Sequence, residues 1–293
     1  MTTAGQPLHP YNLIKQAAFW GIHLGCLLVF ISGFSWAALA VCVTLYVIRM
    51  FGITGVYHRY FSHRTYKTSR FFQFVLAFLG ATSAQKGPIW WASHHRHHHQ
   101  YSDTEEDIHP PRIYGLWWAH VGWVLSTQFI GTRNELVRDL MKYPELRWLD
   151  KYHLVPPMIL MGAVTAFGYL CQALWPELGT GPLQMFVWGF CISTTLLYHG
   201  TFCINSLAHI IGRARFKTGD DSRNSFLLAL ITLGEGWHNN HHRYPGSERQ
   251  GFYWWEIDIS HYILKALSWC GLVWDLREPP ARIYEEAKVG LAA

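Results

Sequence analysis

Long apolar segments limit the folds open to this chain more than any other feature of its sequence. Residues 17–48 are almost wholly apolar, and as one helix they would be roughly 48 Å long. One bilayer crossing needs only about 20 residues, so this stretch predicts two membrane-spanning helices that part near Gly33, Phe34 and Ser35. Two similar stretches follow, and the predicted spans are residues 17–34, 36–56, 158–175 and 183–204.

The composition favours a membrane protein over a soluble one. Half of the 293 residues are hydrophobic and only 15% are charged, an unusual balance for a soluble enzyme. The formal net charge of +5 comes from dispersed residues, so membrane lipid is an expected partner and nucleic acid is not. The six cysteines lie singly and are expected to be core thiols. We expect a single domain over residues 1–293, without a cleaved signal peptide.

The positions of the basic residues predict the orientation in the membrane. Lys and Arg are absent from the short loops after the first and third predicted spans, but they follow the second and fourth spans. By the positive-inside rule, both termini and the long middle segment are cytoplasmic. The predicted fold is an all-α membrane protein with four transmembrane helices and a cytoplasmic helical cap. Residues 71–84, 113–130 and 251–274 are predicted to form helices at the interface or under this cap.

Histidine is concentrated in a few short strings that all fall on the predicted cytoplasmic face. These are HRYFSH with His58 and His63, HHRHHH from His94 to His99, NSLAH ending at His209, and HNNHH with His238, His241 and His242. Imidazole is the commonest neutral metal ligand, so the strings predict a centre with more than one metal ion. An HxxHH string places its three imidazoles on one face of a helix.

The spacing leaves two questions open. The histidines of HRYFSH would lie roughly 140° apart on an α-helix, so they either serve different ions or lie where the helix unwinds. In the middle string, the HxxHH pattern fits equally well when it begins at His94 or at His95. The isolated histidines are expected to be hydrogen-bonded packing residues: His9, His23, His120, His153 and His261. The roles of His109 and His199 are left open.

The residues around the strings narrow the choice of metal. The sequence contains no His-Glu dipeptide, which excludes the HExxH site of the common zinc proteases. Cysteine, the usual ligand of structural zinc, is absent near the strings. Imidazoles alone suit iron, copper or zinc, and a redox-active metal best explains ligands held beside an apolar body. A metal transporter would instead place ionisable residues deep within the spans.

The strings HRYFSHRTYK, WASHHRHHHQYSDTEED, NSLAH and GEGWHNNHHRYP give the chain a specific resemblance to a known family. From about residue 50 to residue 280 it resembles the integral-membrane fatty acid desaturases of the stearoyl-CoA (acyl-CoA delta-9) type. That family has a tryptophan four residues before the first histidine of its middle string. With Trp91 in this position, the resemblance favours the register that begins at His95.

The resemblance implies a centre of two non-haem iron ions carried by the cytoplasmic cap. The implied ligands are His58, His63, His95, His98, His99, His209, His238, His241 and His242, with Asn205 contacting iron through water. In this family the pattern Asp-Pro-His often follows the middle string, whereas this chain has Asp107, Ile108 and His109. That difference lies in a loop and leaves the implied ligand set intact.

The resemblance also implies the reaction. Such oxidoreductases use dioxygen as a co-substrate to remove two hydrogens from a saturated acyl-CoA or acyl-lipid chain, and they leave a cis double bond, by default at the ninth carbon. No cytochrome b5 module, flavin motif or rubredoxin motif is present, so an external donor such as ferredoxin, or cytochrome b5 with its reductase, is expected. A related membrane hydroxylase of alkanes, fatty acids or sterols remains the alternative.

Charged residues flank the histidine strings and have two expected roles. Carboxylates are expected to orient the imidazoles, and the candidates are Asp103, Glu105, Glu106, Asp107 and Glu235. Basic residues are candidates for contacts with a phosphate-bearing headgroup or coenzyme A: Arg64, Lys67, Arg213, Arg215 and Lys217. Each of these basic residues also fits an ordinary positive-inside role.

Overall fold

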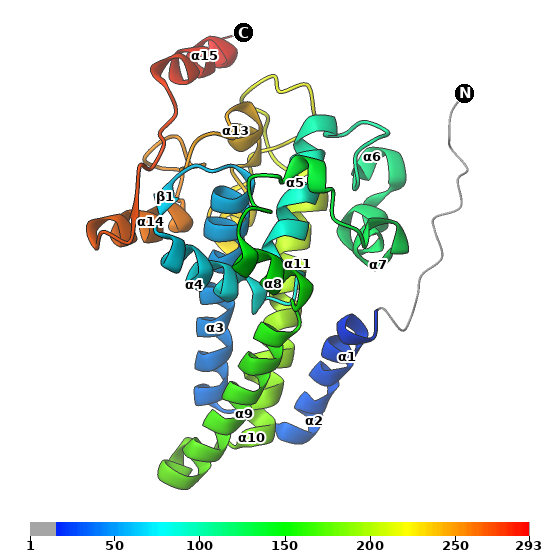
Figure 1. Cartoon of the computed structure of the whole chain (residues 1–293), viewed down its shortest axis with the longest axis vertical. Helices are drawn as coiled ribbons and strands as arrows, with labels where there is room; N and C mark the ends of the chain where they lie inside the picture. Colours follow the sequence, from blue (N-terminus) through cyan, green and yellow to red (C-terminus); the bar gives the residue numbers. More distant parts are fainter. Residues whose placement is uncertain (1–15, 293) are drawn as a thin grey trace.

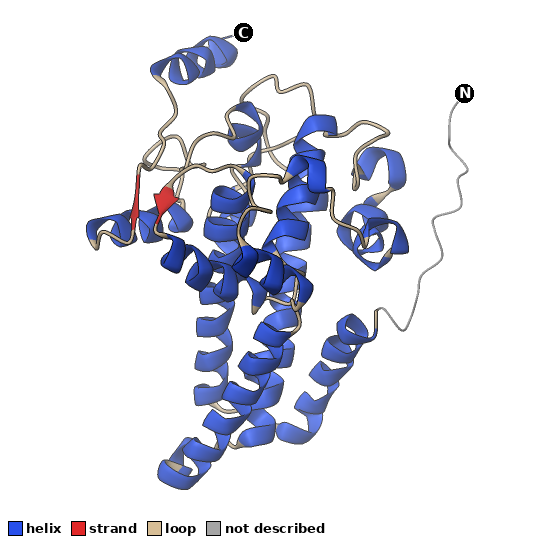
Figure 2. Ribbon diagram, viewed as in Figure 1, coloured by secondary structure: helices blue, strands red, loops and turns tan. Residues whose placement is uncertain are grey.

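The computed structural model describes residues 16–292, and that part of the chain is almost entirely helical. Long helices form a bundle, and shorter helices and loops form a cap over one end of it (Figures 1 and 2). The cap contains a short antiparallel sheet of β1 (Lys67–Thr68) and β2 (Val273–Trp274). His9 and the first residues of the predicted domain lie outside the described residues.

The helices follow one another with few long connections. The α-helices are α1 (Ala17–Gly25), α2 (Val29–Ser32), α3 (Trp36–Phe51), α4 (Arg70–Ala81), α5 (Pro88–Tyr101), α6 (Pro111–Tyr114), α7 (Trp123–Leu125), α8 (Pro144–Lys151), α9 (Val155–Leu174), α10 (Pro182–Met185), α11 (Ser193–Ser206), α12 (Phe226–Ile231), α13 (His238–Arg243), α14 (Ile259–Trp269) and α15 (Ala281–Ala292). The π-helices are η2 (Gly52–Ser62), η3 (Trp118–Gly122) and η7 (Phe186–Ile192). The 3₁₀-helices are η1 (Cys26–Leu28), η4 (Thr127–Phe129), η5 (Asn134–Leu136), η6 (Pro176–Leu178) and η8 (Leu207–His209).

Among the described residues, three helices are long and apolar enough to cross a membrane, whereas the sequence predicts four. They are Trp36–Ser62, Val155–Leu174 and Pro182–His209. The first predicted span is instead the shorter apolar helix Ala17–Ser32. It ends at Gly33, whose φ of +69° is a conformation that favours glycine. The side chain of Ser35 then caps α3 by accepting a hydrogen bond from the backbone of Ala38.

Two of the long helices extend beyond their predicted ends. The second span was predicted to stop at residue 56 and continues to Ser62, and the fourth was predicted to stop at residue 204 and continues to His209. Both extensions enter the cap and carry histidines of the first string and of NSLAH. The membrane helices therefore support part of the candidate metal centre directly.

A buried arginine joins these two long helices. Arg49 of α3 is 1% exposed, and its guanidinium donates to the hydroxyls of Thr194 at 2.8 Å and Ser193 at 2.6 Å on α11. Its Nε donates to the carbonyl of Leu45 at 3.1 Å. Because a buried charge is costly without polar partners, these bonds fix the two helices against each other below the cap.

The cap differs in part from the predicted helices. The helix predicted at residues 71–84 is present as α4 but ends at Ala81, whereas residues 113–130 are divided among α6, η3, α7 and η4. The first break falls at Gly115, which has a φ of +86°. In the stretch at residues 251–274 only α14 is helical: residues 251–258 form loops and turns, and β2 at the end of the stretch pairs with β1.

Candidate metal centre

The first histidine string lies in a π-helix. η2 continues α3 with hydrogen bonds between residues five apart, and the backbone N–H of His63 donates to the carbonyl of His58 at 3.3 Å. A helix that closes its hydrogen bonds over five residues returns residue i+5 to nearly the same face as residue i. His58 and His63 therefore point into one common group, although the α-helical spacing had placed them apart.

The second and fourth strings lie on α5 and α13. On α5, His95 and His99 face the same group as the first string, and His98 faces a different group. His94 instead uses its Nδ1 in a 2.9 Å hydrogen bond with the carbonyl of Trp90. Neither His94 nor His97 joins a group of histidines, so the geometry matches the register that begins at His95.

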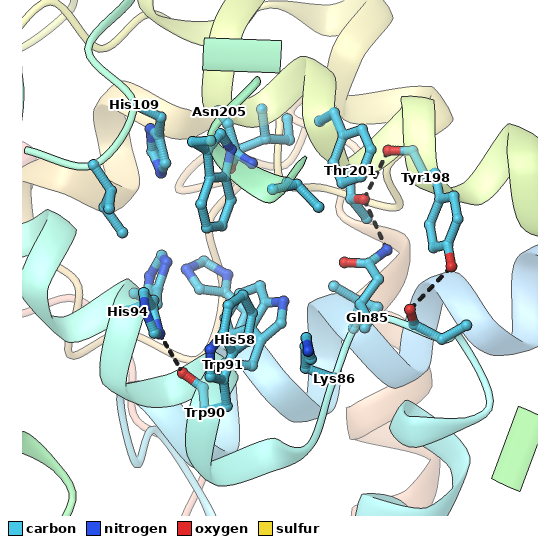
Figure 3. Close-up of a pocket in the computed structure, with 18 of the residues that line it drawn as sticks. His58, Gln85, Lys86, Trp90, Trp91, His94, His109, Tyr198, Thr201 and Asn205 are labelled. Atoms are coloured by element: carbon cyan, nitrogen blue, oxygen red, sulfur yellow. Dashed lines mark hydrogen bonds between the residues drawn. The ribbon is translucent and has the colours of Figure 1, made fainter. Parts of the chain in front are cut away.

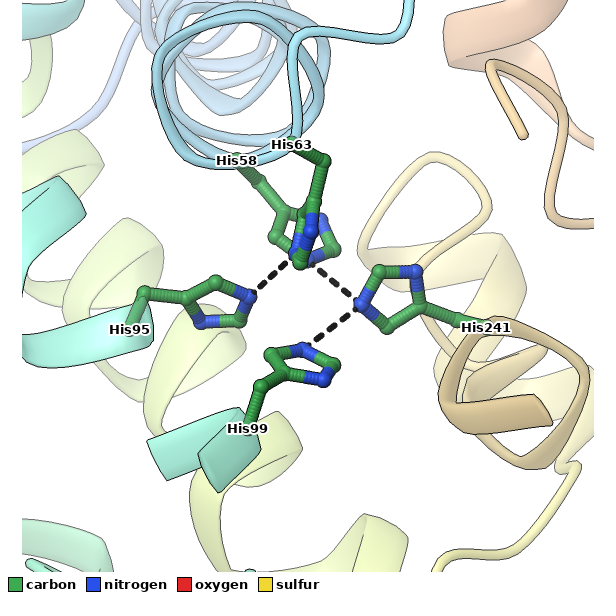
Figure 4. A group of neighbouring side chains, drawn as sticks. All are labelled: His58, His63, His95, His99 and His241. Carbon is green, nitrogen blue, oxygen red and sulfur yellow. Dashed lines mark hydrogen bonds between the residues drawn. The ribbon is translucent and has the colours of Figure 1, made fainter. Parts of the chain in front are cut away.

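In the described part of the chain, nine histidines converge in two groups. The first group has five: His58, His63, His95, His99 and His241 (Figure 4). The second group has four: His98, His209, His238 and His242. Figure 4 shows the members of the first group approaching from three separate segments of the chain. A third, overlapping group consists of His98, Asp107 and His109.

The donor atoms of these groups fit metal ions. The Nε2 atoms of His63 and His95 are 2.8 Å apart, those of His58 and His241 3.0 Å, and those of His209 and His238 3.0 Å. Two nitrogens bound at right angles to one ion, each at about 2.1 Å, would lie about 3.0 Å apart. The separations therefore match those of neighbouring ligands around a common ion.

Hydrogen bonds alone account for these contacts less well. The Nε2 of His241 lies 3.0 Å from that of His58 and 2.9 Å from that of His99, yet one N–H cannot serve both partners. In the second group, the Nε2 of His242 is buried without a partner among the described residues. Buried polar atoms normally find a partner, so the arrangement favours bound metal.

Four carboxylates hold Nδ1 atoms of these histidines. His98 bonds Asp107 at 2.9 Å, His209 bonds Asp103 at 2.7 Å and His242 bonds Asp220 at 2.6 Å. The fourth pair is His58 with Glu235. A carboxylate that accepts from Nδ1–H leaves the Nε2 lone pair for metal. Asp103, Asp107 and Glu235 thus contact histidines, whereas Glu105 and Glu106 are exposed.

The Glu235 carboxylate belongs to a larger buried network that sequence reasoning missed. Arg59, which is 1% exposed, donates to Glu235 at 3.2 Å and to Asp258 at 3.1 Å. The carboxylate of Glu248 lies 3.8 Å from the guanidinium of Arg59 and accepts from His261 at 2.7 Å. The guanidinium therefore balances carboxylates directly behind His58. The sequence feature that could have indicated this network is Arg59, a charged residue between the candidate ligands His58 and His63.

The surroundings keep most of these imidazoles neutral. Burial, followed by the charge of neighbouring histidines, lowers the pKa of five of them well below 6.5: His63, His95, His99, His238 and His241. Burial also lowers the pKa of His242, to about 4. Burial acts in the same direction on His98, but Asp107 outweighs it and raises the pKa. Neutral imidazole is the form that binds metal.

These shifts predict an acid-sensitive metal-free protein. Because the folded-state pKa values are depressed, the unfolded chain binds more protons below about pH 6.5, and stability falls as the pH drops toward the folded values. For His242 the loss at pH 5 is about 2 kcal/mol. We expect the Tm of iron-free protein in detergent to fall steadily from pH 7 to pH 5. A constant Tm over that range would contradict the buried, neutral imidazoles.

Asp220, which no sequence pattern marked, is expected to matter for metal affinity. Its carboxylate accepts from Nδ1 of His242 at 2.6 Å, and loss of such a partner typically weakens metal binding about 10- to 100-fold. Asp220→Asn should therefore release iron at a correspondingly lower chelator concentration. The matched control is Asp221→Asn, because Asp221 pairs with the half-exposed Arg112. Equal iron retention in the two variants would exclude this role.

An apolar cavity of about 250 Å³ opens beside both groups (Figure 3). His58 and His95 line it from the first group, and His98 and His238 from the second. Its other walls include aromatic rings from α5, α7 and α11: Trp90, Trp91, Trp123, Tyr198 and Phe202. Both groups therefore face a space suited to an apolar ligand.

Asn205 and the isolated histidines take different places. Asn205, on the last turn of α11, lines the cavity (Figure 3). His23, His199 and His120 form a hydrogen-bonded chain with separations of 3.2 Å and 3.0 Å, and none of the three belongs to either group. His153 lines the cavity, and His109 packs on His98 with ring centroids 4.4 Å apart.

The basic residues proposed for headgroup contacts lie outside the cavity. Arg64 pairs with Asp139 at 3.0 Å, and Lys67 pairs with Asp275 at 2.8 Å. Arg215 contacts the carboxylate of Glu256 at 2.5 Å. Arg213 and Lys217 are exposed. None of these five side chains is among the described residues that line the cavity.

Comparison with known proteins identifies relatives over most of the chain. The fatty acid desaturase family model matches residues 34–269. An acyl-CoA C20 delta-5 desaturase of Anemone leveillei is 38% identical over 88% of this chain and 80% of its own length. The delta-9 acyl-lipid desaturase 1 of Arabidopsis thaliana is 36% identical over 92% and 84%. An sn-1 stearoyl-lipid 9-desaturase of Anabaena variabilis is 34% identical over 94% and 98%.

Proposed function

The chain belongs to the fatty acid desaturase family, and we propose that it inserts a cis double bond at the ninth carbon of a saturated acyl chain. Membership makes it a membrane oxidoreductase of the acyl-lipid or acyl-CoA desaturase class. The proposal adds the position of the bond, the metal and the ligands. Each turnover converts one –CH₂–CH₂– unit, one O₂, two electrons and two protons into –CH=CH– and two water molecules.

One observation carries the proposal: two histidine groups face the same apolar cavity. We assign one iron ion to each group, with the nine histidines as ligands and Asn205 contacting iron through water. Iron supplies the reduction of dioxygen that breaks unactivated C–H bonds, chemistry that side chains do not provide. Imidazole-only coordination of this kind also agrees with the preferences of iron.

The protein residues have separate tasks in this proposal. The carboxylates orient the imidazoles, and the aromatic walls exclude water and hold the acyl chain beside the metal groups. Gln85 donates to the hydroxyl of Thr201 at 2.9 Å across the cavity wall, which keeps their polar atoms from the chain. Trp91 stacks on His95 with ring centroids 5.1 Å apart and restricts the position of that ring. Positioning of this type accounts for selectivity among many similar methylenes.

The remaining parts of the proposal concern the position of the double bond, the electron donor and the orientation in the membrane. Relatives named as delta-9 and as delta-5 desaturases have similar identities, and we propose the ninth carbon because of the resemblance in the histidine strings. Ferredoxin, or cytochrome b5 with its reductase, is the proposed electron donor. The metal centre and both termini are proposed to face the cytoplasm, because basic residues follow the second and fourth predicted spans.

The fatty acid profile of a desaturase-deficient host that expresses the full chain tests this function. We expect a monounsaturated acid with a cis bond at the ninth carbon, which is absent from the host alone. A double bond at the fifth carbon would overturn the assigned position and leave the desaturase class intact. A hydroxylated acid would favour the membrane hydroxylase alternative instead.

A further inference from the structure

The cavity reaches the surface at the beginning of two apolar helices. Among the described residues that line it, only Ala18 and Leu154 are exposed. Ala18 lies in the first turn of α1, and Leu154 immediately precedes α9. The opening therefore lies at the level where two apolar helices begin.

One loop joins the two sides of this opening into a continuous rim. Ala84 packs in the same cluster as Phe19 of α1. On the other side, burial lowers the pKa of His153, and the charge of the nearby Lys86 lowers it further. Residues 84–86 and His153 all line the cavity. The rim thus runs from α1 across this loop to the start of α9.

The helices on either side of the rim have apolar outer faces. Leu24, Leu27 and Phe30 are exposed on the helix that begins with α1, and Met158 and Phe167 are exposed on α9. Large exposed apolar faces on helices are stable against lipid chains rather than water. Because the rim lies at the first turns of these helices, it is placed at the edge of the hydrocarbon layer.

The residues just outside the rim are typical of a bilayer interface. Trp148 and Tyr152 are each 44% exposed, with ring centroids 5.5 Å apart. The ammonium of Lys151 lies 5.1 Å from the ring of Tyr152. Tryptophan and tyrosine gather at the headgroup level of membranes, and lysine reaches from there toward phosphate.

The same rim has few basic side chains that could bind the phosphates of a coenzyme A nucleotide. Recognition of several phosphates calls for clustered Arg or Lys side chains. Of the described residues that line the cavity, Lys86 is the one Lys or Arg, and the five basic residues considered above lie outside it. Lys86 and His153 instead place polar groups where an ester carbonyl and a single headgroup would meet the rim.

We propose that the acyl chain enters this cavity sideways from the bilayer while it is still esterified to a glycerolipid. The chain passes between the first turns of α1 and α9, and the glycerol and headgroup stay at the membrane surface beside Lys151 and Tyr152. This inference rests on the proposed desaturase function and specifies its substrate class. The position of the opening selects a lipid over a soluble acyl thioester.

Membranes from a host in which the chain has produced the unsaturated acid provide the test, because their electron donor is then known to work. They receive labelled stearoyl-phosphatidylglycerol in one sample and labelled stearoyl-coenzyme A in another, with acyl transfer blocked. We expect the double bond on the lipid-bound chain in the first sample and none on the thioester. Desaturation of the thioester with none on the lipid would overturn the inference. If the chain had no desaturase activity, the fatty acid profile would already have shown no new unsaturated acid. Failure of the proposed function is therefore distinguished from failure of this inference.

Substitutions at the rim test the route separately. Ala18→Trp fills the opening and should lower the rate on the lipid substrate at least about tenfold, with unchanged iron content. Leu24→Trp is the matched control, because Leu24 is exposed on the same helix and does not line the cavity. Leu154→Trp repeats the block from the α9 side if Ala18→Trp accumulates poorly. Rates equal to the control in the iron-loaded variants would overturn lateral entry.

Discussion

His95→Ala is expected to abolish desaturation, by more than about 100-fold, and to remove one of the two iron ions while the protein still inserts into the membrane. The Nε2 of His95 lies 2.8 Å from that of His63 in the first group. Its loss leaves that group one ligand short without touching the second group. His238→Ala and His242→Ala should be equally inactive through the second group. Activity is read from the fatty acid profile, and iron is measured in the purified variant.

The matched control for this substitution lies two residues away. His97 is on the same helix and in the same histidine string, but it joins neither group. His97→Ala should therefore keep both iron ions and near-normal activity. The opposite pattern, with His95→Ala active and His97→Ala inactive, would show that the register of the middle string is wrong.

Arg59→Met is expected to destabilise the protein strongly, by about 3–5 kcal/mol. The guanidinium is buried and contacts Glu235, Glu248 and Asp258. Its removal leaves buried carboxylates without a compensating charge behind His58, and an uncompensated buried charge is costly. Thermal unfolding of the purified protein in detergent, followed by the loss of helical circular dichroism, measures the change.

A surface ion pair provides the comparison. Arg70 contacts Glu145 at 2.7 Å, but its side chain is 63% exposed. Exposed pairs contribute little to stability, so Arg70→Met should leave the Tm nearly unchanged. If Arg59→Met and Arg70→Met had the same Tm, the buried network would not have the stabilising role assigned to it.

Hydrophobicity predicted the helical bundle well and the cap poorly. The break between the first two apolar helices fell at Gly33 as expected, because glycine there adopts a positive φ. The ends at Ser62 and His209 were missed, because apolar length measures the bilayer crossing and not a helix that continues into a cap. The stretch at residues 113–130 is equally apolar, yet Gly115 and the packing of its aromatic rings divide it into short pieces.

The candidate site was predictable to a different degree at each level. The histidine strings predicted which histidines lie together in the structure, because imidazoles at helical spacing are a strong local signal. The π-helix that unites His58 and His63 had no such signal, since it depends on how η2 packs against its neighbours. Asp220 also had no local signal, because it contacts His242 from a loop that is 22 residues away in the sequence.

The number of iron ions bound per chain tests the central claim most directly. The purified chain, loaded with ferrous iron and freed of excess metal, is measured by elemental mass spectrometry against protein concentration. Two groups of histidines, one of five and one of four, predict two iron ions per chain. A single iron per chain, or retention of zinc alone in a protein that desaturates fatty acids, would contradict the proposed centre.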